Sequence, residues 1–247
     1  MIYMLYSLTL SDGSSTFLVH YGIKGMRWGE WTEDTRRRYG HTTLKKGAIV
    51  SRYSRQSQFD NYKHDPLSGS MKYVSTNKVD HARWKQLFDR DHAIYGEPKV
   101  TSETLYEATN SLRVAKAKKA GKLYVDKVLP TLSPEAKSEV DWYFKSHVAP
   151  RLNRVGQNVT GFTVEQALDR KVVGKRTSQD VASMLASDSL RFLDVDGHNE
   201  SSRKLMNELK KKGYSAVQDC IGWDTADDPL VIFDPKKNLR VAAEKKL

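Results

Sequence analysis

Polar and apolar residues alternate in several short stretches of the chain, as they do in strands that bury one face. These stretches are bounded by turn-forming residues, and they predict strands at 3–10, 16–21, 47–54, 71–76, 99–109 and 213–219. A continuous apolar run predicts a further strand at 229–233. The sequence SDGSS between the first two strands predicts an N-terminal hairpin.

Other stretches repeat their apolar residues at helical spacing. They predict a helix capped by Asn77 or Asp80, and helices at 112–129, from Ser133-Pro134 onward, and at 163–172, 178–187 and 200–212. This order predicts an α+β protein with a small mixed or antiparallel sheet. We expect an N-terminal segment, 1–42, and a principal domain, 43–247, with a helical insertion at about 110–195.

The formal net charge of +11 gives the chain an attraction for polyanions, which include nucleic acid, anionic lipid and acidic proteins. Cys220 is the single cysteine, so neither an intrachain disulfide nor a cysteine-based zinc site can form. The apolar start, MIYMLYSLTL, is too short to span a bilayer and lacks the basic residues of a secretory signal. We expect a soluble protein without a membrane partner.

Basic residues gather in separate clusters, of which two are candidate nucleic-acid contacts. One is Arg36, Arg37 and Arg38. The other is Arg113, Lys116, Lys119 and Lys122, whose three-residue spacing on a helix would follow a phosphate backbone or simply form a solvated face. The histidines show no metal-binding spacing, so no metal is expected.

The segment HYGIKGMRWG, residues 20–29, combines three glycines with two apolar anchors, Met26 and Trp28, and two cations, Lys24 and Arg27. Glycine permits tight backbone geometry, and aromatic and Met anchors are typical of docking elements. Two interpretations stay open: a short element that docks on another protein, or a glycine-rich turn that leads into the core.

The same segment resembles a motif of the form H-x-G-x-x-G-M-(K/R)-W-G, found in head and other virion proteins of phages that infect Gram-positive bacteria. The matching positions are His20, Gly22, Gly25, Met26, Arg27, Trp28 and Gly29. The resemblance implies a minor head-associated protein of a tailed bacteriophage, located in the virion and, during assembly, in the host cytoplasm. Its implied partners are capsid or portal proteins, with the packaged DNA as a further candidate.

A second, looser resemblance concerns ADP-ribosyltransferase-like domains of phages and toxins. Arg52, Ser75 with Thr76, and Glu107 follow the Arg, Ser-Thr and Glu order of that family, with Arg55, Glu103 and Asp219 as alternates. In the family, the arginine contacts the phosphates of NAD, the hydroxyl residues orient the nicotinamide half, and the glutamate binds a ribose hydroxyl.

The C-terminal sequences GYSAVQD and PLVIFDP also resemble the last strands of such domains, which implies an ADP-ribosyltransferase-like fold. The usual glutamate pair is absent, and Gln218 and Asp219 stand there instead. Arg52, Ser75 and Glu107 can equally be strand residues that face solvent. A virion protein of this kind is expected to need no cofactor. The alternatives are an ADP-ribosyltransferase effector that uses NAD, and a nucleic-acid-binding or nuclease module.

Overall fold

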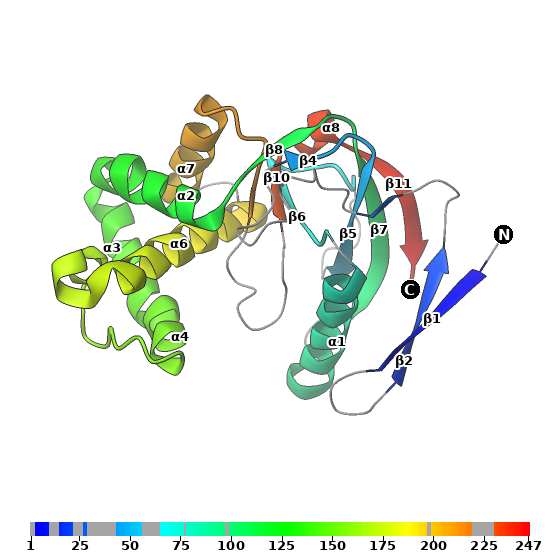
Figure 1. Ribbon diagram of the computed structural model, residues 1–247, viewed down its shortest axis with the longest axis horizontal. Coiled ribbons are helices and arrows are strands. Elements are labelled where there is room, and N and C mark those ends of the chain that lie inside the picture. The colour runs from blue at the N-terminus through cyan, green and yellow to red at the C-terminus, as the bar shows by residue number, and fades with distance from the viewer. Residues whose placement is uncertain are drawn as a thin grey trace.

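The computed structural model describes residues 3–9, 15–21, 27–28, 43–55, 65–76, 78–96, 99–196, 199–218 and 230–247. These residues form two mixed sheets, a separate hairpin, and a group of helices that extends to one side of the sheets (Figure 1). The α+β class predicted from the sequence is confirmed.

The five-stranded sheet has the order β4, β8, β9, β10, β6. Its strands are Thr43–Leu44, Leu112–Ala115, Ala216–Gln218, Leu230–Phe233 and Met71–Val74, in that order. β8 and β9 are parallel, and the other neighbours are antiparallel. Parallel neighbours need a long crossover connection, and here that connection contains the helices.

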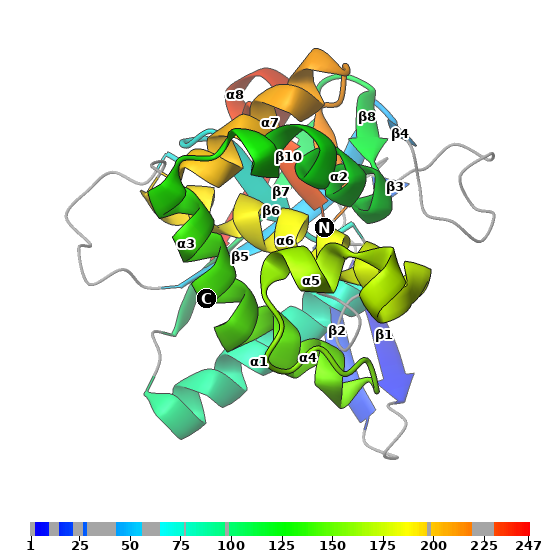
Figure 2. The same cartoon turned by 90° about the vertical axis from the view of Figure 1, so that its left-hand side faces the viewer.

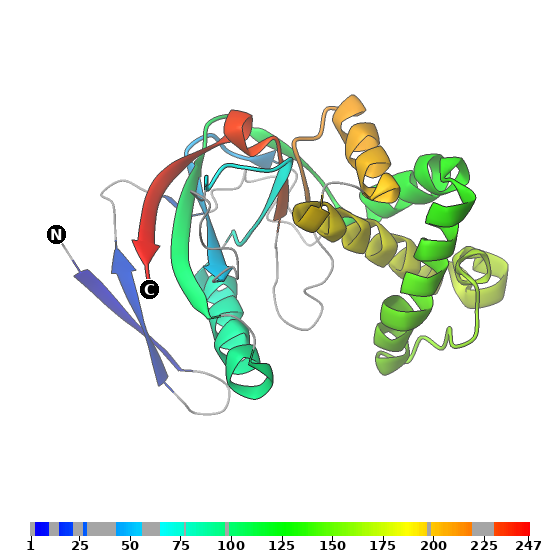
Figure 3. The same ribbon diagram turned by 180° about the vertical axis from the view of Figure 1, so that it is seen from behind.

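The four-stranded sheet has the order β11, β7, β5, β3, with strands Leu239–Lys246, Val100–Ala108, Ala48–Arg55 and Arg27–Trp28. β3 runs parallel to β5 at the edge of the sheet, and the other pairs are antiparallel. Among the described residues, β1 (Tyr3–Thr9) and β2 (Ser15–Tyr21) pair only with each other. This hairpin lies on the side of the molecule away from the helices of residues 117–211 (Figure 3).

The inner faces of the two sheets meet in one apolar layer, which we call the inter-sheet core. Val50 and Tyr106 enter it from the four-stranded sheet, and Leu112, Val114 and Ile232 enter it from the five-stranded sheet. The short helix α8 (Pro235–Asn238) joins β10 to β11. The helix α1 (Lys78–Tyr95) packs against β5 and β7 (Figure 1).

The helical lobe, residues 117–211, is inserted between β8 and β9. It contains the α-helices α2 (Ala117–Leu123), α3 (Pro134–Tyr143), α4 (Ala149–Arg154), α5 (Val164–Leu168), α6 (Arg170–Asp196) and α7 (Glu200–Lys211). Two π-helical turns, Tyr124–Val128 and Phe144–Val148, and a 3-10 turn, Leu129–Thr131, complete it. Figure 2 shows these helices stacked in front of the sheets.

Local signals start several helices of the lobe. The Ser133 hydroxyl accepts from the Ala136 N–H, and Pro134 occupies the first turn, as the sequence predicts. Thr163 and Gln166 form a capping box at α5. The helical geometry of α6 is interrupted at Gly174, whose φ of 80° kinks the helix.

The core of the lobe is shared with the outer face of the five-stranded sheet. Tyr124, Phe144 and Leu152 from the helices belong to the same buried cluster as Val231 and Phe233 from β10. The two parts therefore cannot separate without exposing apolar surface.

The predicted helix at 112–129 is wrong in its first part, because Leu112–Ala115 is the strand β8. Leu112 and Val114 are buried between the sheets, and Arg113 between them is exposed, which is the two-residue period of a strand. The helices extend over 117–211 rather than about 110–195. β11 falls on a mostly polar stretch for which the sequence predicts no element.

Candidate functional site

Arg52 and Ser75, two residues of the predicted transferase triad, lie on neighbouring segments where the two sheets meet. An antiparallel bridge joins Ser51 to Ser75. The Ser51 N–H donates to the Ser75 carbonyl at 3.0 Å, and the Ser75 N–H donates to the Ser51 carbonyl at 2.8 Å. The structure thus brings the backbones of the predicted arginine and serine together.

The predicted glutamates lie on the face of the four-stranded sheet opposite to Arg52. Arg52 is opposite Thr104 in β7, whereas Glu103 and Glu107 occupy the alternate positions of the same strand. Opposite residues point to the same face and successive residues to opposite faces. Arg52 therefore points away from both glutamates, and the triad Arg52, Ser75 and Glu107 is not assembled as one site.

Glu107 also has a local partner. The Arg240 guanidinium, from β11, donates to Glu107 Oε2 with its Nη2 at 2.7 Å and its Nε at 3.1 Å. This two-donor contact gives Glu107 the role of a cross-strand ion pair. Of the alternates, Asp219 lies outside the described residues, as does the side chain of Arg55 at the end of β5.

Tyr53 is the most electrostatically perturbed side chain of this region. Burial raises the pKa of its phenol, and the negative charges of Glu103 and Asp89 raise it further. The phenol consequently stays protonated at neutral pH. It can donate a hydrogen bond, but it cannot act as a general base.

The motif residues are only partly described. His20 is in β2, where it pairs with Met4. Arg27 and Trp28 form β3 and pair with Ala48 and Ile49. The remaining motif positions, Gly22, Gly25, Met26 and Gly29, lie outside the described residues.

The predicted basic stripe does not form on one helix, because Arg113 is in β8. Its guanidinium lies 4.6 Å from the centre of the Tyr214 ring and donates to the Lys212 carbonyl at 3.0 Å. Lys116 is the residue that precedes α2, and Lys119 and Lys122 lie within that helix, where Lys122 is paired with Asp126. Arg36, Arg37 and Arg38 lie outside the described residues.

Over the described ranges, histidine, cysteine, aspartate and glutamate nowhere gather in a group of three that could hold a metal ion. Over the same ranges, none of the helices is both long enough and apolar enough to cross a membrane.

A pocket of about 320 Å³ opens in the helical lobe between α3, α6 and the start of α7. Its apolar side is formed by Val140, Trp142, Tyr143 and Leu185. Trp142 is 64% exposed, although it is among the largest apolar side chains of the protein. The pocket is of the size at which small-molecule sites begin.

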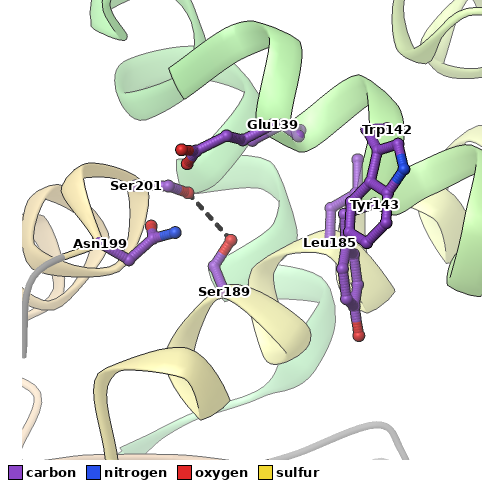
Figure 4. A pocket seen from close by; sticks show the side chains of 8 residues that line it. Glu139, Trp142, Tyr143, Leu185, Ser189, Asn199 and Ser201 are labelled. Atoms are coloured by element: carbon purple, nitrogen blue, oxygen red, sulfur yellow. Dashed lines mark hydrogen bonds between the residues drawn. The ribbon is translucent and has the colours of Figure 1, made fainter. Parts of the chain in front are cut away.

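The polar side of the pocket is formed by Glu139, Ser189, Asn199 and Ser201 (Figure 4). The Ser189 and Ser201 hydroxyls are 2.9 Å apart and hydrogen-bonded. Behind them, the buried Tyr124 hydroxyl is 2.8 Å from the Ser201 hydroxyl. Burial raises the pKa of Tyr124, so this chain of hydroxyls is uncharged.

The sequence alone does not predict this pocket. Its helical spacing assigns Val140, Tyr143, Phe144 and Val148 to the buried face of a helix, and Trp142 falls outside that face. A tryptophan on the exposed side of a helix was the available signal. The serines and Asn199 carried none, because they come from elements that are distant in the sequence.

The comparisons with known proteins add one short match. Residues 11–30 match a family of unknown function, DUF7211. Comparison with curated proteins and with solved structures gives no match.

Proposed function

We propose that this protein is a minor, head-associated virion protein of a tailed bacteriophage, and that residues 20–29 bind it to a capsid or portal protein. The observation that carries the proposal is the resemblance of this segment to the virion-protein motif. Residues 20–29 lie within the stretch, 11–30, that matches a family of unknown function.

The position of the motif also suits a docking element. Among the described residues, Arg27 and Trp28 form one of the two edge strands of the four-stranded sheet. An edge strand has one side without a strand neighbour, and such edges are used to bind other chains. The net charge of +11 would in addition place the protein favourably beside packaged DNA.

Incorporation into particles tests the proposal. The full chain and a Met26→Ala/Trp28→Ala variant are expressed during infection, and their copies per purified head are counted by quantitative mass spectrometry. Loss of two apolar anchors should lower incorporation by about tenfold or more, since each hot-spot anchor contributes about 1–2 kcal/mol.

Trp31→Ala is the matched control, because it removes a tryptophan just outside the motif. A reporter that carries residues 18–31 should enter heads as well. Purified particles without the chain, or equal incorporation of the three proteins, would contradict the proposal.

The second candidate is an ADP-ribosyltransferase that uses NAD. One observation favours it: the Ser51–Ser75 bridge joins the Arg52 strand to the predicted Ser-Thr pair. Ser75 points to the same face as Ser51, Glu103 and Glu107, which is the face opposite to Arg52, and of the two glutamates Glu107 is already paired with Arg240. In this candidate, Glu103 rather than Glu107 would stabilise the developing positive charge of the ribose.

Release of nicotinamide from NAD by the full-length protein tests this candidate. Glu103→Gln should lower turnover by about 100-fold, which is typical when an electrostatic contact to the reacting group is lost. Glu107→Gln is the matched control on the same strand and face, and it should change turnover by no more than about twofold. Absence of nicotinamide release from the wild type would eliminate the transferase and leave the virion role standing.

A further inference from the structure

The pocket of the helical lobe is unrelated to the motif and to the predicted triad, and its chemistry selects a class of ligand. Trp142 and Tyr143 supply aromatic surface on one side. The hydroxyls of Ser189 and Ser201 supply donors and acceptors on the other side (Figure 4). A ligand that fits both sides has one apolar face and a polar edge.

The electrostatics of the pocket oppose anionic ligands. Glu139 is the charged residue among the described lining residues, and no lysine or arginine lines the pocket with it. Asn199 caps α7, a helix of 12 residues, but Glu200 in its first turn offsets the positive end of the helix dipole. The helix end thus offers neutral hydrogen-bonding groups from Asn199 and Ser201, which suit a neutral polar ligand.

A hydroxyl group on the ligand can hydrogen-bond both to the carboxylate of Glu139 and to the donors beside it. It can donate to the Glu139 carboxylate and accept from a serine hydroxyl or from the Asn199 amide, because a hydroxyl is both donor and acceptor. Asn199 is held for this role, since its Oδ1 accepts from the Ser202 N–H at 3.2 Å, and its amide nitrogen points toward Ser189 (Figure 4).

The floor of the pocket is fixed in place by buried contacts. Tyr124, which has 0% exposure, hydrogen-bonds with Ser201, and Ser201 hydrogen-bonds with Ser189. The Ser202 hydroxyl donates to the Ser189 carbonyl and so ties α7 to α6. Such a preorganised polar floor lowers the cost of orienting a ligand.

We propose that this pocket binds a neutral sugar ring. The apolar face of the ring would lie against Trp142, where C–H groups contact the aromatic face, beside Tyr143, one face of which is stacked on His147. Its hydroxyls would contact Glu139, Asn199 and Ser201. The proposal is independent of the virion role, because the pocket shares no residue with the motif.

Binding to the full-length protein tests the proposal, with methyl β-D-glucopyranoside, N-acetylglucosamine and maltose as probes. Affinity is measured by calorimetry. The indole N–H resonance of Trp142, identified by its loss in Trp142→Phe, locates the ligand. At least one sugar should bind and shift this resonance, and Trp142→Leu should weaken binding by about tenfold or more.

Glu139→Gln should weaken binding by about fivefold, while Glu135→Gln should leave it unchanged. Both glutamates are exposed on α3, one turn apart, and only Glu139 lines the pocket. Thermal unfolding of each variant shows whether its fold is retained.

Three results would overturn the proposal. The first is that none of the sugars binds, or that they bind Trp142→Leu as well as the wild type. The second is that choline binds more tightly than every sugar, which would make this a cation site. The third is that cyclohexanol binds as well as the sugars, which would make it a merely apolar pocket.

Discussion

The helical lobe and the pair of sheets build their interiors from different parts of the chain. In the lobe, the buried residues follow one another closely, from Ala120 through Phe144 to Leu209. In the inter-sheet core, Leu44, Val74, Leu112 and Leu239 come from segments that are far apart in the sequence. Local contacts can form early and independently, whereas the sheet contacts require the whole chain to be in place.

Buried polar atoms are only partly satisfied in both regions. In the lobe, Arg151 pairs with Asp188 and Gln157 donates to Asp180, while Asp188 Oδ1 and Gln157 Oε1 make no hydrogen bond within the described ranges. In the sheets, the same holds for the buried hydroxyls of Ser51 and Thr104. The lobe buries the carboxylates of Asp180 and Asp188, so substitutions that remove their partners should have the larger effects.

The largest effect is expected from Arg151→Met. Its guanidinium pairs with the carboxylate of Asp188, whose side chain is 1% exposed. Removing one partner of a buried pair leaves a poorly compensated charge, so we expect a loss of about 3 kcal/mol in the free energy of unfolding. Urea denaturation followed by circular dichroism measures it. Because the lobe shares its core with β10, the transition should shift as a whole rather than split.

Arg154→Met is the matched control on the same helix. Arg154 is exposed, and its substitution should change the free energy of unfolding by less than about 0.5 kcal/mol. Equal effects of the two substitutions would show that the ion pair is not what stabilises the lobe. A separate early transition in Arg151→Met would show that the lobe and the sheets unfold independently.

Gly121→Ala tests the closest packing of the lobe and should have the next largest effect. A Cβ at position 121 would lie 2.6 Å from the backbone nitrogen of Ser183 and 2.7 Å from the carbonyl carbon of Ala182. Backbone atoms cannot move aside without separating α2 from α6. We expect a loss of about 2–3 kcal/mol, within the range for overpacked cores.

Gly156→Ala separates this clash from backbone strain. Gly156 has a φ of 80° and open space around it, so an alanine there meets strain but no clash. A loss of about 1 kcal/mol is expected. If Gly121→Ala cost no more than this, the contact between α2 and α6 would be looser than the structure shows.

The same difference between regions explains how much of the fold the sequence predicts. Ser133 and Pro134 start α3, and Gly213 follows α7, because capping is a local signal that the sequence contains in full. The sequence pattern assigns Leu112–Ala115 to a helix, because the strand conformation of this segment depends on β9 and β4, which are distant partners. The mostly polar β11 is determined by its pairing with β7.

The candidate sites follow the same logic. The resemblance to transferase domains implies that Arg52, Ser75 and Glu107 converge, and the bridge between Ser51 and Ser75 brings only the backbones of the first two segments together. The facing of Glu107 depends on strand register, which residue order does not contain. The pocket depends on Trp142 meeting Ser201 across two helices, and no spacing within one segment encodes that contact.

Acid stability gives a smaller and pH-dependent test of the lobe. Burial by itself would raise the pKa of Asp141, but the hydrogen bonds from Lys145 and from the Val164 N–H, with the charge of Lys145, lower it overall. Because the pKa of Asp141 is lower in the folded protein, its charged form adds to the free energy of unfolding. This contribution is complete above the ordinary pKa of an aspartate, near 4, and is lost as the pH falls through the pKa of Asp141 in the folded protein.

Asp141→Asn should therefore lower the free energy of unfolding by about 1 kcal/mol at pH 7, and the difference should shrink toward pH 2. Urea denaturation at a series of pH values measures this difference. Glu139→Gln, at an exposed position nearer the middle of the same helix, is the control and should change the free energy of unfolding at pH 7 by less than about 0.5 kcal/mol. A difference that stays constant between pH 7 and pH 2 would show that the Asp141 charge does not hold α3 to the start of α5.

The smallest effect is expected at the contact between the helical lobe and the five-stranded sheet. Lys210, in the last turn of α7, pairs with Asp234 after β10, with Nζ and Oδ1 2.6 Å apart. Asp234 has a φ of 48°, which asparagine also tolerates, so Asp234→Asn removes the charge and keeps the turn.

With Lys210→Met as the second substitution, a double-mutant cycle should give a coupling of about 0.5 kcal/mol, because both side chains are partly exposed. The coupling should fall in 1 M salt. If it is zero at low salt, the ion pair between Lys210 and Asp234 contributes nothing to the junction between the lobe and the sheets.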